Sequence, residues 1–222
     1  MKSVSVVVLA GLALILCASA DAITIRYAAS VPAAPTNWTS TLSFPKFNQS
    51  LGALNSVTIQ LTGTVGGTMA FESLDSSSST VSMRLAATIL LKTSDGSLVG
   101  TATPEVSVAA DASAFDGIID FAGTSGRRYT DLQGSNTFSL TSTLPSDLAE
   151  FIGADDGFTT LEVTGASNGN GPGNLILLFN TNCAAEVSVE YSYSPPGAVP
   201  EPASLALLGT ALSGMLCLRR RR

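Results

Sequence analysis

Apolar and polar residues alternate along the middle of this chain, and this alternation limits its fold more than any other feature. Between residues 56 and 65, Val57, Ile59 and Leu61 fall on one face, while hydroxyl and amide residues fall on the other. Turn-forming residues recur roughly every eight to twelve positions, as in all-β folds. We therefore predict a two-sheet antiparallel β-sandwich, jelly-roll or immunoglobulin-like, with one short helix.

The alternation and the turn residues together predict individual elements. Gly66 and Gly67 are expected to form the turn of a hairpin, and residues 94–97 are expected to form a tight turn. Pro104 marks an edge or a bulge. Ser146 is expected to cap the helix, which stops at Gly153. Residues 168–173 are predicted to be a loop. The expected strands are residues 22–27, 56–65, 68–72, 81–92, 98–109, 136–142, 159–164, 175–180 and 185–193.

The N-terminus has the order of a secretory signal peptide. One lysine, Lys2, precedes an apolar stretch over residues 4–17, and the small residues Ala18 and Ala20 stand at the −3 and −1 positions before Asp21. The stretch is shorter than the roughly 20 residues that a membrane span needs. We expect export through the Sec translocon and cleavage by signal peptidase after residue 20, with an uncleaved anchor as the alternative.

The C-terminus combines a proline-rich linker with an apolar segment and a basic end. The linker, residues 195–202, cannot be helix or central strand, because proline lacks the N–H donor and has a fixed φ. Residues 203–218 are apolar or small and predict a transmembrane helix. Four arginines follow and should stay cytoplasmic, so the body would lie outside the cytoplasmic membrane. These arginines are Arg219, Arg220, Arg221 and Arg222.

This C-terminal pattern resembles the PEP-CTERM sorting signal of Gram-negative bacteria. The resemblance is carried by Val199, Pro200, Glu201 and Pro202, followed by the apolar segment and the arginines. It implies recognition by exosortase, a membrane-embedded cysteine transpeptidase that would cut near the motif. The protein would then be anchored transiently in the inner membrane and end in the envelope, on the outer surface or outside the cell. A permanent tail anchor is the alternative.

Charge and residue usage exclude several classes of function. The termini contain five of eleven basic residues but only one of seventeen acidic residues, Glu201, so residues 21–198 carry a formal charge of about −10. This disfavours nucleic-acid binding, which needs a basic face. The chain has no histidine, which removes the usual general base and most zinc sites. Only Cys183 remains in the body, and we expect it to be half-buried at the start of a strand.

The body resembles the choice-of-anchor E domain, a family of secreted bacterial domains. The similarity is carried by residues 37–54, residues 114–126 and residues 187–193, and would span about residues 22–193. No catalytic residue follows from this resemblance. We expect four regions: a signal peptide (1–20), the β-sandwich (21–194), the linker (195–202) and the transmembrane helix with its arginine tail (203–222).

Four aspartates lie close together in sequence, at Asp111, Asp116, Asp120 and Asp131. Calcium takes several carboxylate and carbonyl oxygens, so this region is a candidate calcium site, and no other cofactor is expected. The spacing is not that of an EF-hand loop. Asp-Gly pairs also occur in turns because aspartate bonds its own backbone, and turns are the alternative interpretation.

The remaining candidates concern carbohydrate. Five aromatic residues could form a sugar-binding platform, although a sandwich also needs aromatic residues in its core. Paired carboxylates, Asp116 with Asp120 or Glu162 with another acid, could serve a glycan hydrolase. We favour a non-enzymatic structural or adhesive protein of exopolysaccharide or biofilm, with a carbohydrate-binding module as the alternative and the hydrolase third. The five aromatic residues are Trp38, Phe44, Phe47, Tyr129 and Tyr191.

Overall fold

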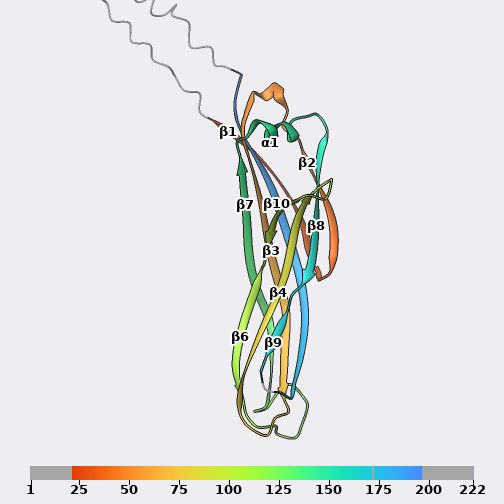
Figure 1. Cartoon of the computed structure of the whole chain (residues 1–222), viewed down its shortest axis with the longest axis vertical. Helices are drawn as coiled ribbons and strands as arrows, with labels where there is room; N and C mark the ends of the chain where they lie inside the picture. The colour runs from red at the N-terminus through yellow and green to blue at the C-terminus, as the bar shows by residue number, and fades with distance from the viewer. Residues whose placement is uncertain (1–21, 172, 197–222) are drawn as a thin grey trace, which may run out of the picture.

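The computed structural model describes residues 22–171 and 173–196, and they form two antiparallel β-sheets packed around one apolar core (Figure 1). The first sheet has the order β1-β10-β3-β7, and its long strands run along the long axis of the molecule. The predicted signal peptide and transmembrane helix lie outside the described residues. The bounds are Ile23–Pro35 for β1, Leu175–Ser194 for β10, Ala53–Ser73 for β3 and Gly126–Ser142 for β7.

The second sheet is built on β4 (Ser79–Thr93), which is paired on both sides along its length. β8 (Asp156–Gly165) and β9 (Asn168–Asn170) follow one another along one side, and β5 (Leu98–Ala102) and β6 (Glu105–Ala112) follow one another along the other. β2 (Trp38–Pro45) completes the sheet by pairing with β8. The two short helices are η1 (Gln49–Leu51) and α1 (Pro145–Glu150). No helix within the described residues is long and apolar enough to cross a membrane.

Burial follows the alternation that the sequence predicts. In β3, Val57, Ile59 and Leu61 are buried, and the residues between them are partly exposed. The outer face of the first sheet is hydroxyl-rich, and threonine pairs such as Thr58 and Thr141 join their Oγ1 atoms across strands at 2.8 Å. The all-β prediction is therefore confirmed, because period-two alternation places one set of side chains between the sheets.

The predicted hairpin at Gly66 and Gly67 is wrong, because β3 runs through both glycines. Gly67 has φ +147° and pairs with Thr181 of β10, and the pairing with β7 shifts register between Gly67 and Met69. The glycine therefore forms a local irregularity rather than a turn. β3 is paired on both sides at this point, and these neighbours keep the strand continuous.

Other strand boundaries also differ from the prediction. Residues 175–180 and 185–193 belong to one strand, β10, because residues 181–184 between them pair with residues 64–67 of β3. The predicted loop at 168–173 contains β9, which pairs with β4. Residues 98–109 divide at Pro104, whose carbonyl accepts a hydrogen bond from the Ala87 N–H at 3.1 Å. β2 was not predicted, and the 94–97 turn is confirmed by the Thr93 N–H to Ser97 carbonyl bond.

The short helix lies where the sequence predicts, but its cap differs. Helix α1 begins at Pro145 with Leu144 as the N-cap residue, and Ser146 does not cap it. Proline at the first helical position needs no hydrogen-bond acceptor, so the helix starts before the serine. The helix is followed by Phe151 as C-cap, two residues before Gly153.

Cys183 is fully buried in the middle of β10, so the predicted half-buried position at a strand start is wrong. It lies between Asn182 and Ala184 in the segment where β10 passes across Gly66, Val65 and Thr64 of β3. The continuity of β10 is the reason for this burial, because the residue points to the interior like its neighbours two positions away.

Candidate ligand-binding site

A cavity of about 540 Å³ opens at one end of the two sheets, between the β4–β5 turn and the start of β8. Its interior is apolar and its rim is polar. This combination is typical of small-molecule sites, which usually measure about 300–1,000 Å³. The apolar lining residues are Phe44, Ile59, Val99, Phe151, Phe158, Val189 and Tyr191, and the polar ones are Lys46, Thr93, Ser94, Asp95, Ser97, Glu150, Asp156 and Thr159.

The floor of the cavity is held rigidly by Tyr191 of β10. Its hydroxyl donates a hydrogen bond to the Pro45 carbonyl at 3.0 Å, and its ring packs edge-on against Tyr27 and Phe151. Burial, with a smaller contribution from Tyr27, raises the pKa of Tyr191 to about 12. The phenol is therefore a neutral donor fixed by its own carbonyl partner, and the ring serves as an apolar wall.

One side of the rim is formed by the tight turn between β4 and β5. The Asp95 carboxylate accepts hydrogen bonds from the Thr93 hydroxyl, from the Ser97 N–H at 3.1 Å and from the Ser97 hydroxyl at 3.2 Å. These hydrogen bonds, that from Thr93 first, lower the pKa of Asp95. The carboxylate stays ionised at neutral pH and is suited to accept hydrogen bonds from a ligand rather than to donate a proton.

The opposite side of the rim comes from the start of β8. Phe158 is 54% exposed, although it is a large apolar side chain. The Oγ1 atom of the next residue, Thr159, is buried and has no hydrogen-bond partner among the described residues. Period-two alternation along β8 places Thr159 on the inner face of the strand and Phe158 on the outer face, so the Thr159 hydroxyl is not open to the cavity.

The charges around the rim are mostly negative. Asp95, Glu150 and Asp156 face a single cation, Lys46, in the lining of the cavity. Asp156 also accepts a hydrogen bond from the Ser43 hydroxyl at 3.2 Å. The local potential therefore disfavours anionic ligands.

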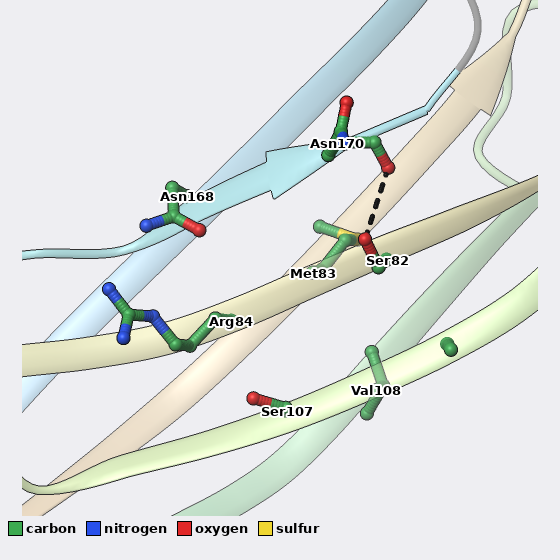
Figure 2. A pocket seen from close by; sticks show the side chains of 8 residues that line it. Ser82, Met83, Arg84, Ser107, Val108, Asn168 and Asn170 are labelled. Carbon is green, nitrogen blue, oxygen red and sulfur yellow. Dashed lines mark hydrogen bonds between the residues drawn. The ribbon is translucent and has the colours of Figure 1, made fainter.

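A second, shallower groove of about 390 Å³ crosses β9, β4 and β6 (Figure 2). Arg84 is paired in register with Asn168 on one side and Ser107 on the other, and its guanidinium forms an ion pair with Glu105 at 2.8 Å. The Ser82 hydroxyl donates to the Asn170 carbonyl at 3.4 Å. The Arg84 guanidinium is already paired with Glu105 and the Ser82 hydroxyl with the Asn170 carbonyl, which makes this groove the weaker candidate.

The candidate calcium residues serve separate turns and strands. Asp111 in β6 accepts a hydrogen bond from Thr80 at 2.8 Å. Asp116 and Asp120 each accept a hydrogen bond from the backbone N–H two residues ahead. This bond is typical of aspartate in a turn, the alternative to a calcium site. Asp131 lies in β7 with φ +56°. Within residues 22–171 and 173–196, no group of three or more acidic or cysteine residues is placed to hold a metal ion.

The loop that contains Asp116 and Asp120 is anchored by Glu72, which the sequence analysis missed. Its carboxylate is fully buried and accepts hydrogen bonds from the Ser125 hydroxyl at 2.6 Å and the Phe121 N–H at 2.7 Å. The alternation of β3 places Glu72 on the face opposite Phe71, and only the folded loop covers it. The sequence did show one indication of this role, because Glu72 is a charged residue at the end of an otherwise apolar run.

Two of the five predicted aromatic residues, Phe44 and Tyr191, line the cavity. Phe47 is buried in the core, and Trp38 and Tyr129 are partly buried. Glu162 forms an ion pair with Lys92. The structure does not bring Asp116, Asp120 or Glu162 to the cavity. Phe151, Phe158 and Thr159 were not singled out, because no local sequence pattern places the α1–β8 segment beside Phe44 and Tyr191.

Solved structures give only weak matches. The chain is 7% identical to a chain of Desmodium yellow mottle tymovirus, with a TM-score of 0.21, covering 86% of this chain and 97% of that chain. For turnip yellow mosaic virus the identity is 10%, the TM-score 0.24 and the coverage 82% and 98%. For the VP2 subviral particle of infectious bursal disease virus the identity is 16% and the TM-score is 0.21, and the match covers 82% of this chain and 39% of that chain. TM-scores this low say nothing about fold or function.

The sequence comparison gives one positive result. No curated protein sequence matches the chain. A family described as the PEP-CTERM protein-sorting motif matches residues 198–222. The predicted motif is therefore found at the C-terminus. It suggests a protein that is exported through an exosortase system, processed by exosortase-type machinery and anchored at the membrane during sorting.

Proposed function

We propose that the protein is a non-enzymatic structural or adhesive component of extracellular polymer, sorted to the cell surface or beyond by exosortase. The observation that carries the proposal is the PEP-CTERM motif at residues 198–222. The signal peptide expected over residues 1–20 supplies the matching entry step. Residues 22–196 would be the delivered cargo, and the choice-of-anchor E resemblance agrees with a surface role.

The arrangement of the chain ends supports this role. Ile23 at the start of β1 pairs with Tyr193 near the end of β10, so the chain enters and leaves the two sheets side by side. Strand β10 ends at Ser194, before Pro195, Pro196 and the sorting motif. Cleavage beyond this point would leave every strand of the body intact, which suits a cargo that is separated from its tail.

The absence of catalysis is part of the proposal. The sequence contains no histidine. The cavity rim holds carboxylates, but a glycan hydrolase needs a carboxylic acid with a raised pKa as proton donor. Hydrogen bonds lower the pKa of Asp95 instead. Carbohydrate binding is the second candidate, and the aromatic and polar lining of the cavity at β8 favours it.

The sorting proposal is tested by intact-mass spectrometry of the secreted protein from a host with and without exosortase. We expect the mass with exosortase to correspond to a chain cut between residues 194 and 203, lacking Arg219 to Arg222. A double variant, Pro200→Ala with Pro202→Ala, should stay uncut. The matched control, Pro195→Ala with Pro196→Ala, should be cut normally.

Secreted wild-type protein that still carries Arg222 would contradict the sorting proposal. Equal processing of the motif variant and the linker control would contradict the role of the motif.

A further inference from the structure

We propose that the outer edge of β1 pairs with the same edge of a second copy of this chain, so that the first sheets of the two copies become continuous. The pairing is antiparallel and has two-fold symmetry, because each copy contributes the same residues. It is centred on Ala28, which lies opposite Ala28 of the second copy. This interface goes beyond the proposed sorting role and does not depend on it.

The first part of β1 is an open edge of the first sheet. Residues 23–31 pair with β10 on one side without a register shift, and no strand within residues 22–171 and 173–196 pairs with them on the other. Their outward N–H and C=O groups are therefore free to bond another extended chain. Pro32, Pro35 and a register shift after Val31 protect only the rest of the strand.

The other edges of the two sheets are covered or carry no complementary charge. Strands β5 and β6 lie against β7. A Cβ atom at Gly134 of β7 would be 2.0 Å from the Glu105 carbonyl oxygen, and one at Gly100 of β5 would be 2.1 Å from the Phe138 ring. The edge strand β2 is uncharged, and its neighbour β8 has acidic residues as its only charges. Two paired copies of β2 would therefore gain no ion pair.

Side chains on the inner face of β1 fit the proposed register. Ile25, Tyr27, Ala29 and Val31 are partly buried and pack against the core. With Ala28 at the two-fold axis, Ile25 lies beside Val31 of the second copy, and Tyr27 lies beside Ala29. Branched side chains therefore meet each other and the large ring meets a small residue. Cross-strand pairs of this kind are the units that stabilise a sheet.

Charges on the outer face are complementary in the same register. Arg26 lies opposite Ser30 of the second copy, and Ser30 is paired with Glu186 of β10. The Arg26 guanidinium therefore has to span two strand spacings, about 10 Å, to reach that carboxylate. It already reaches across β10 in its own sheet, where it donates to the Gln60 Oε1 atom of β3 at 3.3 Å. Neither Arg26 nor Glu186 forms an ion pair within the described part of the chain.

Disulfide trapping of the full chain in detergent tests the register. Ala28→Cys places two Cα atoms about 4.5–5.5 Å apart at the axis, within the range of disulfides. The native cysteines are replaced by alanine. Mild oxidation of Ala28→Cys should give at least about tenfold more linked dimer than Thr41→Cys on a non-reducing gel. Thr41→Cys is the matched control, because Thr41 is exposed on the open edge strand β2. The native cysteines are Cys17, Cys183 and Cys217.

Charge exchange tests the contact across the interface by analytical ultracentrifugation. Arg26→Glu should raise the dissociation constant of the dimer about fivefold, and adding Glu186→Arg should restore it to within about twofold. Adding Glu190→Arg instead should not restore it, because Glu190 pairs with Arg26 inside one copy. Ala28→Lys should raise the constant about tenfold or more, since like charges then meet at the axis. Its thermal midpoint at low concentration should match the wild type, because Ala28 is exposed.

The pairing is overturned if Ala28→Cys and Thr41→Cys are linked equally, or if neither is linked. It is also overturned if Arg26→Glu leaves association unchanged, or if Glu190→Arg restores association as well as Glu186→Arg does. Links in secreting cells from Ala28→Cys to another polypeptide, with none between copies, would assign the edge to a different partner and overturn it too. Association is measured without exosortase, so failed sorting would leave these results unchanged.

Discussion

Cys183 shows how one side chain takes its chemistry from its place in the core. The thiol is fully buried between the sheets, and burial raises its pKa to about 11 from an ordinary value of 9.0. Thiolate is the reactive form of cysteine, so this residue is suited to packing rather than to disulfide exchange or catalysis. Its role in the folded protein is that of a small apolar residue.

This burial predicts a loss of stability at alkaline pH. The unfolded thiol releases its proton near 9.0 and the folded thiol only near 11, so the contribution to stability is complete below 9.0 and lost as pH rises toward 11. Urea unfolding measured across this range should show the loss. Cys183→Ala should flatten the decline. Equal slopes for the variant and the wild type would contradict the assignment.

Strands β3 and β10 approach each other closely at a glycine, Gly67, where no side chain would fit. In β3, Gly67 has φ +147°, and a Cβ atom there would lie 1.9 Å from the Asn180 carbonyl oxygen of β10. The two strands approach so closely because β3 continues through a local irregularity without ending. A side chain would have to push the two backbones apart.

Gly67→Ala should therefore destabilise the protein by about 3 kcal/mol or more, because it adds backbone strain to a steric clash between central strands. Equilibrium urea unfolding measures the change. Gly173→Ala is the matched control, since a Cβ atom there meets nothing within 4 Å. Similar unfolding midpoints for the two variants would show that β3 and β10 can separate at this point without loss.

The same residues show what a prediction from sequence misses at this scale. Gly66 and Gly67 have the composition of a turn, and residues 168–173 have that of a loop, yet both include strand residues. In each case a neighbouring strand supplies hydrogen bonds that local preference does not include. Pro104 behaved as expected, because a missing N–H donor interrupts a strand whatever surrounds it.

Across the whole molecule, the strand pairs join distant parts of the chain. Strand β1 pairs with β10, so that Ile23 lies opposite Tyr193, and β2 pairs with β8. Such pairs form only after long loops have closed, which makes folding slow. We expect refolding to take about milliseconds to seconds or longer. Stopped-flow fluorescence of Trp38 measures this rate. Complete refolding within microseconds would contradict this.

The candidate site also belongs to this largest scale. Phe44, Phe151, Phe158 and Tyr191 are spread over more than half of the chain and meet at one opening. Phe44 and Tyr191 could be chosen from the sequence as aromatic candidates. Their partners could not, because a backbone hydrogen bond from the Phe47 N–H to the Phe151 carbonyl joins two segments that lie far apart in the sequence.

The sequence by itself determined the class of fold, the exclusion of histidine chemistry and the C-terminal sorting motif. These depend on local order and on residue types, which are complete in the chain before it folds. Only the tertiary structure decided that β3 and β10 are continuous, that Glu72 holds the loop containing Asp116 and Asp120, and that Phe44 and Tyr191 line the same cavity as Phe158. These features arise from burial and from contacts between distant segments, which local sequence does not contain.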